Sequence, residues 1–275
     1  MGIAHLNFYY RMETSTFILE KDFASQGFTH IIGTDEVGRG PLCGPVVACA
    51  AMYRGDEFPE LNSESELSSE ERKKWDLIRD SKKLSEKQRE DIFDFIGEYF
   101  HLGIGLCDHE TIDRINILEA SFLAMKKAIQ ELMRNVERET HNKIQETCLP
   151  DRQARNKFQT NGNNQNPNTK ENLKSRIYNP KSIILVDGNK VIPNLSMEQY
   201  AVIGGDKLVK SISAASIVAK VTRDRMMKEF ALLYPQYGME RHMGYGTKVH
   251  MEALLKHGPC PIHRKSFAPV RRLSK

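Results

Sequence analysis

The chain has 275 residues, with 40 Lys and Arg against 36 Asp and Glu and a net charge of +4, and 40% of its residues are hydrophobic. This length and composition suit one large domain with a sizeable core and argue against an intrinsically disordered chain. The five cysteines form no C-x-x-C pair and no run approaches ~18 apolar residues, so we expect no disulfide framework, no zinc knuckle and no membrane span, and a reducing cytoplasmic location fits.

The first third of the chain predicts an extension followed by a β-hairpin. Residues 1–27 show no clear apolar period and are too few for a separate domain. Phe28–Asp35 predicts a strand, and the apolar run Gly44–Tyr53 follows after one turn, which is typical of an antiparallel hairpin. The acidic, Ser-rich residues 54–79 predict a surface loop containing at most one helical turn.

Helices and strands then alternate. Ser85 and Gln88 have the spacing of a capping box and predict the start of a helix. His101–Cys107 predicts a strand, and Ile117–Val136 predicts a long helix with one apolar face. Residues 135–180 contain ten Asn and few apolar residues, which predicts a mobile insertion at about 138–178.

The C-terminal part predicts two more strands and two more helices. They are strands at Ser182–Asp187 and Tyr200–Gly204, and helices at Ile212–Leu233 and from Thr247 to about Gly258. We therefore expect an α/β catalytic domain over 28–238, built on a mixed sheet flanked by helices, and a helical C-terminal extension over 239–275. The last 13 residues carry five Lys or Arg and no acid, which fits either a nucleic-acid-binding patch or a solvated tail.

Three acids fall at the carboxyl ends of predicted strands, where α/β sheets gather ligands. Asp35 and Glu36 close the first strand, and Asp187 closes a later one. Because neighbouring residues on a regular strand point to opposite faces, the first strand should end or bulge at its acid pair, and Gly38 and Gly40 allow that. Carboxylate oxygens favour Mg²⁺ or Mn²⁺ over zinc, and two such ions suit phosphodiester hydrolysis.

Asp224 is a fourth candidate acid. It lies on the same face of its predicted helix as Ile217 and Val221, and an inward carboxylate is costly unless it is paired or bound to a metal. Pairing with Arg223 or Arg225 is the alternative explanation.

Two glycine-flanked elements predict contact with a ligand. Gly38-Arg39-Gly40 lets backbone approach closely, and the planar guanidinium of Arg39 suits phosphate. Tyr245 lies between two glycines and could stack on a sugar or base, or it could be a core tyrosine in a tight turn.

Seven segments, in the same order along the chain, resemble the ribonuclease HII family, the bacterial type 2 ribonucleases H. They are Asp35–Val47 (Asp-Glu-Val-Gly-Arg-Gly-Pro-Leu-Cys-Gly-Pro-Val-Val), Asp80–Ser85, Ile115–Ala120, Val186–Asn189, Ser213–Asp224, Gly244–Thr247 and His263–Val270. The loop at 54–79 and the Asn-rich insertion are longer than this family leads us to expect.

The resemblance implies a ribonuclease H-like fold and an endonuclease that acts on nucleic acid with Mn²⁺ or Mg²⁺. Such an enzyme would cut the RNA strand of RNA–DNA hybrids and nick 5′ of single ribonucleotides in duplex DNA, leaving 3′-hydroxyl and 5′-phosphate ends. The resemblance implies Asp35, Glu36 and Asp187 as metal ligands, with Asp224 as the fourth catalytic acid. It also implies that Gly38, Arg39 and Gly40 read the ribose 2′-hydroxyl, and that Tyr245 stacks on the deoxyribose beyond it.

Four other interpretations compete with this one. Ribonuclease HIII resembles this family but usually has Gly-Thr-Gly at the position of Gly38-Arg39-Gly40 and carries an additional N-terminal domain. A DNA-only nuclease of the same superfamily would share the acids but not the Gly-Arg-Gly and Tyr245 pair. A binding module that no longer cuts should lack an acid, and a nucleotide hydrolase needs a Walker lysine that the sequence does not show.

No coiled-coil seam is evident in the sequence, so we expect the protein to be a monomer.

Overall fold

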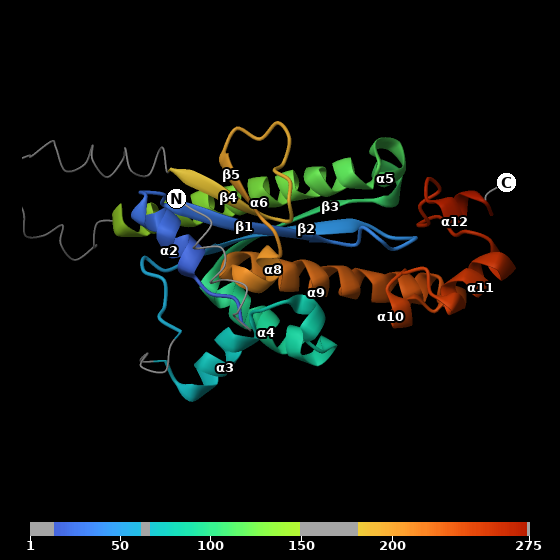
Figure 1. The fold of residues 1–275 in the computed structure, drawn as a ribbon, viewed down its shortest axis with the longest axis horizontal. Coiled ribbons are helices and arrows are strands. Elements are labelled where there is room, and N and C mark those ends of the chain that lie inside the picture. The colour runs from blue at the N-terminus through green and yellow to red at the C-terminus, as the bar shows by residue number, and fades with distance from the viewer. Residues whose placement is uncertain (1–13, 62–66, 149–180, 274–275) are drawn as a thin grey trace, which may run out of the picture.

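The computed structural model describes residues 14–61, 67–148 and 181–273. Its centre is one five-stranded sheet with the strand order β3-β2-β1-β4-β5 (Figure 1). The ends of the chain and most of the predicted Asn-rich insertion lie outside the described residues.

The sheet is antiparallel on one side of its central strand and parallel on the other. β1 pairs antiparallel with β2, and β2 pairs antiparallel with β3, whereas β1–β4 and β4–β5 are parallel pairs. The strands are β1 (His30–Val37), β2 (Val46–Tyr53), β3 (Phe100–Cys107), β4 (Ser182–Asp187) and β5 (Glu198–Val202). The predicted hairpin and the mixed α/β sheet are therefore confirmed.

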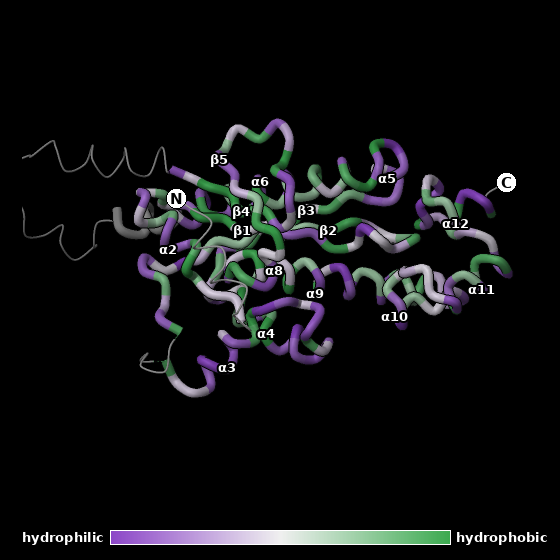
Figure 2. Tube along the Cα trace, viewed as in Figure 1, coloured by the Kyte–Doolittle hydropathy of each residue, from purple (hydrophilic) through white to green (hydrophobic). Residues whose placement is uncertain are grey.

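Helices cover both faces of the sheet. α6 (Ile117–Cys148) packs on one face, against β1, β2 and β3, while α9 (Lys210–Leu233) packs on the other face with α4 (Glu86–Tyr99) outside it (Figure 1). The remaining helices are α2 (Ile18–Ser25), α3 (Ser69–Leu77), α5 (His109–Ile115), α8 (Gly205–Leu208), α10 (Met239–His242), α11 (Lys248–His257) and α12 (Ala268–Arg271). Hydrophobic residues are concentrated in the strands of the sheet, whereas α3 and α4 contain many hydrophilic residues (Figure 2).

Small residues in the sheet let the helices approach closely. A Cβ added to Gly103 would lie 2.2 Å from the carbonyl oxygen of Ala128, and one added to Gly105 would lie 2.1 Å from that of Ala124. The backbone of α6 therefore rests directly on β3, and any side chain at either glycine would force the layers apart.

Several elements differ from their predicted extents, and α3, α6 and β1 are the ones that bear on the layers and the site. The segment expected to be a loop contains the nine-residue helix α3, which a Ser68–Glu71 capping box starts and a fully buried Trp75 anchors. The helix predicted to end at Val136 continues to Cys148 and so enters the predicted insertion, of which 149–178 lies outside the described residues. β1 continues to Val37, past both acids.

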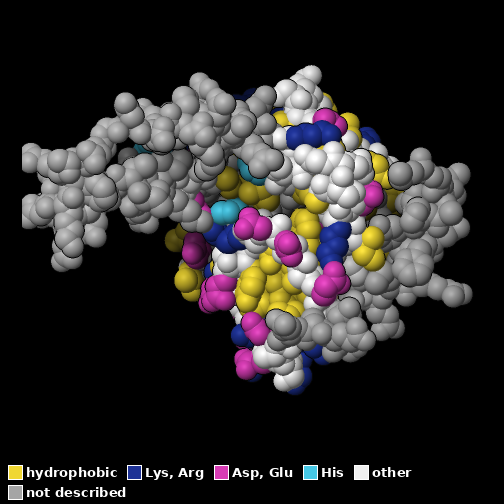
Figure 3. All heavy atoms as spheres, turned by 90° about the vertical axis from the view of Figure 1, so that its left-hand side faces the viewer, with side chains coloured by type: hydrophobic (Ala, Val, Ile, Leu, Met, Phe, Trp, Pro, Cys, Tyr) yellow, Lys and Arg dark blue, Asp and Glu magenta, His cyan; other side chains and the backbone are white. Residues whose placement is uncertain are grey.

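The C-terminal helices α10, α11 and α12 gather beyond the end of the sheet where β1 finishes (Figure 1). Backbone contacts join the two regions: Cys43 forms an isolated bridge with His263, and the Leu42 N–H donates to the Gly244 carbonyl at 2.8 Å. At the opposite end of the molecule, acidic and basic side chains are interspersed around an exposed apolar area (Figure 3). None of the helices among the described residues is long and apolar enough to cross a membrane.

Candidate active site

The acid pair of β1 lies within a regular ladder. Asp35 is opposite Cys49 of β2 and Glu36 is opposite Ala48, so the strand neither ends nor bulges at the pair, and that expectation was wrong. The two side chains therefore leave opposite faces of the sheet. They still belong to one site because β1 continues past the end of its pairing with β4. The last β1 residue that pairs with β4 is Thr34, so the β1 edge that carries Asp35 and Glu36 is not covered by β4.

Asp187 completes the group from the neighbouring strand. It follows Val186, the last β4 residue paired with β1, and so lies beside Asp35 across the parallel ladder. Its Oδ1 accepts a hydrogen bond from the backbone N–H of Asp206 at 3.2 Å. The first turn of α8 thus fixes the Asp187 carboxylate, and it brings a fourth acid, Asp206, to the site.

Asp206 is a functional candidate that we did not predict. It is 3% exposed, and its charge contributes to raising the pKa values of both Asp35 and Asp187. Its Oδ2 lies 3.3 Å from Nζ of Lys82, whose side chain is 80% exposed. Although partial burial opposes it, the charge of Asp206 raises the pKa of Lys82, which keeps this ammonium charged beside the acids.

Burial and mutual repulsion raise the pKa values of Asp35, Glu36 and Asp187. For Asp35, burial has the largest effect, Asp187 and Glu36 add to it, and a hydrogen bond with the Ser216 hydroxyl opposes it, leaving the pKa well above its usual value. Burial also raises the pKa of Glu36, although the Arg39 guanidinium at 3.1 Å works against the shift.

The charges of this group fit a divalent cation. Four carboxylates converge, and the ion pairs that the described residues make with them are Arg39–Glu36 and Lys82–Asp206. Two more acids than cations therefore share a largely buried site, which is unfavourable without a further positive charge. All the ligand atoms are hard oxygens, which suit Mg²⁺ or Mn²⁺.

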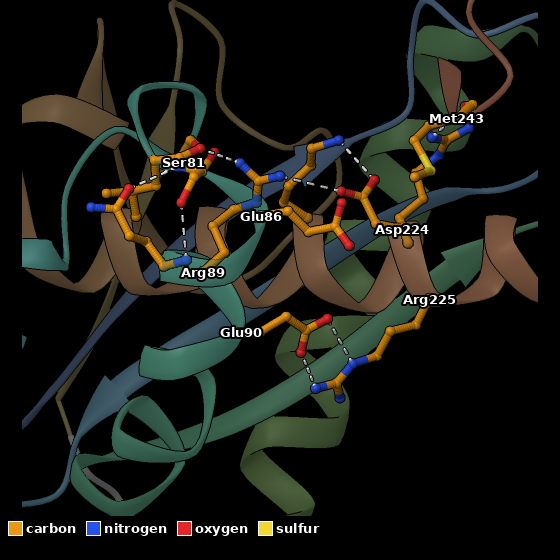
Figure 4. Close-up of polar contacts among 12 residues, drawn as sticks. Ser81, Glu86, Arg89, Glu90, Asp224, Arg225 and Met243 are labelled. Carbon is orange, nitrogen blue, oxygen red and sulfur yellow. Dashed lines mark hydrogen bonds and ion pairs between the residues drawn. The ribbon is translucent and has the colours of Figure 1, made fainter. Parts of the chain in front are cut away.

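Asp224 lies elsewhere, and both of its carboxylate oxygens are paired. Lys220, one turn earlier on α9, approaches Oδ1 at 2.7 Å, and Arg89 of α4 approaches Oδ2 at 3.6 Å (Figure 4). Asp224 is eight residues beyond Ser216, which corresponds to about 12 Å along the helix axis. The structure therefore does not bring Asp224 to the other acids.

The cations that pair with Asp224 are not the two that the sequence suggested. Arg225 pairs with Glu90 of α4 (Figure 4), and Arg223 donates to the backbone carbonyls of Pro45, Met243 and Cys43. Pairing nevertheless accounts for the inward carboxylate, as the alternative explanation required.

The Gly-Arg-Gly turn and Tyr245 come together in space. A Cβ added to Gly40 would lie 3.4 Å from Cε1 of Tyr245, whose side chain is 43% exposed. Gly38 has a φ of +99°, and a Cβ there would meet Nε of Arg223 at 2.4 Å, so only glycine fits. Glu36, Arg39 and Asp187 line one pocket beside this turn.

The basic C-terminal run is not a uniform surface patch. His263 and Arg264 are fully buried, whereas Lys265 and Arg271 are exposed. Among the described lysines and arginines of this run, Arg264 is buried while Lys265, Arg271 and Arg272 are exposed, so both the nucleic-acid patch and the solvated tail stay predictions for the exposed three.

Known proteins similar to this chain agree with the fold and with the motifs. The family model described as ribonuclease HII matches residues 32–177 and 126–270. A ribonuclease HII from Endomicrobium trichonymphae is 39% identical over 261 residues, covering 94% of this chain and 95% of that protein. One from Caldicellulosiruptor saccharolyticus is 37% identical, covering 93% of this chain and 95% of that protein.

Solved structures show the same fold at low sequence identity. Ribonuclease H2 from Pyrococcus horikoshii superimposes with a TM-score of 0.51 at 22% identity, covering 89% of this chain and 97% of that chain. Bst-RNase HIII in complex with Mn²⁺ gives a TM-score of 0.53 at 15% identity, covering 90% of this chain and 70% of that chain. The ribonuclease H-like fold is thus confirmed, and the family match extends over most of the sequence: the chain belongs to the ribonuclease HII family of nucleases.

Proposed function

We propose that this nuclease cuts the RNA strand of RNA–DNA hybrids and nicks duplex DNA 5′ of single embedded ribonucleotides, leaving 3′-hydroxyl and 5′-phosphate ends. The observation that carries the proposal is the convergence of Asp35, Glu36, Asp187 and Asp206 beside the Gly-Arg-Gly turn. The four acids carry excess negative charge, which suits metal-dependent hydrolysis of a phosphodiester. The backbone of the adjoining Gly-Arg-Gly turn can approach a sugar closely, which suits selection of a ribonucleotide.

In this proposal Asp35, Glu36 and Asp187 hold two divalent ions, Mn²⁺ or Mg²⁺. Asp206, rather than Asp224, is the fourth acid, because it adjoins the other three whereas Asp224 is paired with Lys220 and Arg89. When bound, such ions activate the attacking water and stabilise charge on the leaving oxygen.

The protein's own groups fix the acids before substrate arrives. The Ser216 hydroxyl bonds to Asp35, the Asp206 N–H holds Asp187, and Arg39 holds Glu36. Because the carboxylates are already oriented, little reorganisation is needed during the reaction. The exposed ammonium of Lys82 is placed to contact a backbone phosphate near Asp206.

Selection of the ribonucleotide is assigned to the neighbouring turn. The backbone of Gly38, Arg39 and Gly40 would bond to the 2′-hydroxyl, the one group that separates RNA from DNA at a given site. Tyr245, which adjoins Gly40 and remains partly exposed, would stack on the deoxyribose of the next nucleotide. We also expect the protein to act as a cytoplasmic monomer.

The test is a nicking assay on a DNA duplex that carries one ribonucleotide. Wild-type protein and Asp35→Asn would be incubated with Mg²⁺, Mn²⁺ or EDTA, beside an all-DNA duplex of the same sequence. Metal-dependent nicking 5′ of the ribonucleotide, lost in the variant, is the expected result. Binding of the duplex without nicking in either metal would instead support a module that no longer cuts.

A further inference from the structure

Arg264 is a fully buried cation that bonds only to backbone carbonyls. It is 0% exposed, and its side-chain hydrogen bonds all go to carbonyl oxygens of the loop from Gly38 to Gly44. Nε and Nη2 both donate to Gly44, at 3.0 and 2.9 Å, and Nη1 donates to Arg39 and Pro41, at 3.1 and 2.8 Å. Nη2 also donates to Gly38 at 2.6 Å, so all five N–H donors of the guanidinium are used.

Carbonyl dipoles take the place of a counter-ion here. Burial, reinforced by the nearby charge of Arg223, lowers the pKa of Arg264 to about 9, so the group remains charged at neutral pH. A buried charge without an anion is unfavourable unless dipoles are oriented toward it. Four loop carbonyls are turned inward to supply those dipoles, which couples the conformation of the loop to this side chain.

The inward carbonyls determine where the N–H groups of the same peptides point. A trans peptide is planar, with its C=O and the following N–H on opposite sides. When the carbonyls of Gly38 and Arg39 face Arg264, the N–H groups of Arg39 and Gly40 therefore face away from it. Tyr245 adjoins the same turn, because a Cβ added to Gly40 would lie 3.4 Å from its Cε1.

Arg223 of α9 also donates to the loop, at the Cys43 carbonyl, and the remaining backbone anchors come from the C-terminal extension. The Leu42 N–H donates to Gly244, the Gly44 N–H donates to Ile262, and the Arg264 N–H donates to Leu42. The extension therefore holds the loop through both its backbone and the guanidinium. Lysine could not replace the guanidinium because an ammonium has three donors and no planar fork.

We propose that Arg264 is a positioning residue that aims the N–H groups of Arg39 and Gly40 at the 2′-hydroxyl of the ribonucleotide. This rests on the proposed function, because it concerns how that site reads a ribose. Arg264 acts through the loop and does not itself meet the nucleic acid, since it is fully buried.

The test compares affinities for two duplexes in protein that cannot cut. In an Asp35→Asn background, Kd would be measured for a DNA duplex with one ribonucleotide and for the same duplex in all-DNA form, in EDTA and well below the melting temperature. We expect Arg264→Lys to reduce the preference for the ribonucleotide about tenfold, the order expected for losing one or two hydrogen bonds. A lower folded fraction weakens the apparent affinities for both duplexes equally. The ratio of the two Kd values therefore depends on the conformation of the loop and not on overall stability.

Arg271→Gln is the matched control, because it removes one positive charge from an exposed position of the same extension. It should leave the ratio unchanged. An unchanged ratio in Arg264→Lys would overturn the positioning role. If the Asp35→Asn background itself showed no preference and the wild type did not nick, the proposed function would fail instead.

A second measurement needs no change at Arg264. In the same Asp35→Asn protein, the amide resonances of Arg39 and Gly40 should shift when the ribonucleotide duplex is added, and not when the all-DNA duplex is added. Identical responses to the two duplexes would contradict the assigned direction of these N–H groups, even if the Arg264 variants did not fold.

Discussion

The acid cluster and the C-terminal end of the molecule both bury charge, but only the second gives every charge a partner. At the acid cluster, Asp35, Asp187 and Asp206 repel one another, and their neighbours supply too few cations. At the other end, Arg223 and Arg264 lie close together, yet each donates to several backbone carbonyls. Burial of charge therefore does not by itself identify a binding site; in this molecule the difference is whether the charge is already satisfied.

The histidines beneath the C-terminal helices illustrate the satisfied case. One ligand atom from each of Cys43, His250 and His263 lies within 4.8 Å of the others, a grouping that resembles a metal site. However, His263 accepts from the Cys260 N–H at 3.0 Å, the two imidazoles share a 3.0 Å hydrogen bond, and His250 bonds to the Tyr245 carbonyl at 3.0 Å. Each ring nitrogen of this pair has a protein partner, so the group supports the Tyr245 turn and needs no ion.

The largest expected effect is at the acid cluster, where the charges lack partners. Asp35→Asn removes a ligand and a charge, so the single-turnover cleavage rate should fall on the order of a thousandfold. Duplex affinity should stay within about threefold, because the substitution removes a negative charge and leaves the groups that bind phosphate in place. Rapid-quench assays and fluorescence anisotropy would measure the two quantities, and full activity in the variant would exclude Asp35 as a ligand.

At the C-terminal end, the buried His263 should make the stability of the protein depend on pH. Burial lowers the pKa of His263 to about 4, whereas the unfolded chain takes up the proton near its ordinary value of 6.5. The unfolded state therefore binds more protons, and the free energy of unfolding should fall by about 3 kcal/mol as the pH drops through this interval. Urea unfolding of wild type and His263→Gln at several pH values isolates this contribution; parallel curves would contradict it.

Tyr245 lies between the two regions, and its loss should affect one substrate more than another. Tyr245→Ala should lower kcat/KM about tenfold on a single embedded ribonucleotide, the order expected for one stacking contact. A long RNA–DNA hybrid offers ribose beyond the cleavage site and should lose less. Equal losses on both substrates would remove the case for sensing the junction.

The smallest expected effect is a gain in stability. The folded-state pKa of Asp35 is raised, so its ionisation costs stability as the pH rises above about 4. Metal-free Asp35→Asn should therefore be more stable than metal-free wild type at about pH 8, and the difference should shrink toward acid pH. Thermal melts in EDTA measure it, and a less stable variant at alkaline pH would count against repulsion within the cluster.

Much of the fold and part of the site could be predicted from the sequence. Apolar runs located the strands, and the position of Asp35, Glu36 and Asp187 at the carboxyl ends of those strands predicted that they share one end of the sheet. Helix α3 was missed because its residues are mostly polar and its single anchor, Trp75, gives no period.

The fourth acid of the site could not be predicted from the sequence. Asp206 lies in a short, glycine-rich connection with no apolar pattern, and its only local signal is an acid directly after Gly204-Gly205 between a strand and a helix. Asp224 drew attention because it faces inward within a recognisable block. One of its two partners, Arg89, is distant in sequence, so its pairing appears only once α4 has packed beside α9.

The measurement that tests the central claim most directly compares Asp206→Asn with Asp224→Asn. Single-turnover nicking of a duplex with one ribonucleotide would be followed in Mg²⁺, with urea unfolding of each protein in parallel. We expect Asp206→Asn to lose on the order of a hundredfold in rate while remaining folded. Asp224→Asn should lose about 1–3 kcal/mol of stability and retain a rate within about threefold of wild type. The reverse result, a slow Asp224→Asn beside an active Asp206→Asn, would contradict the claim that the unsatisfied cluster is the active site.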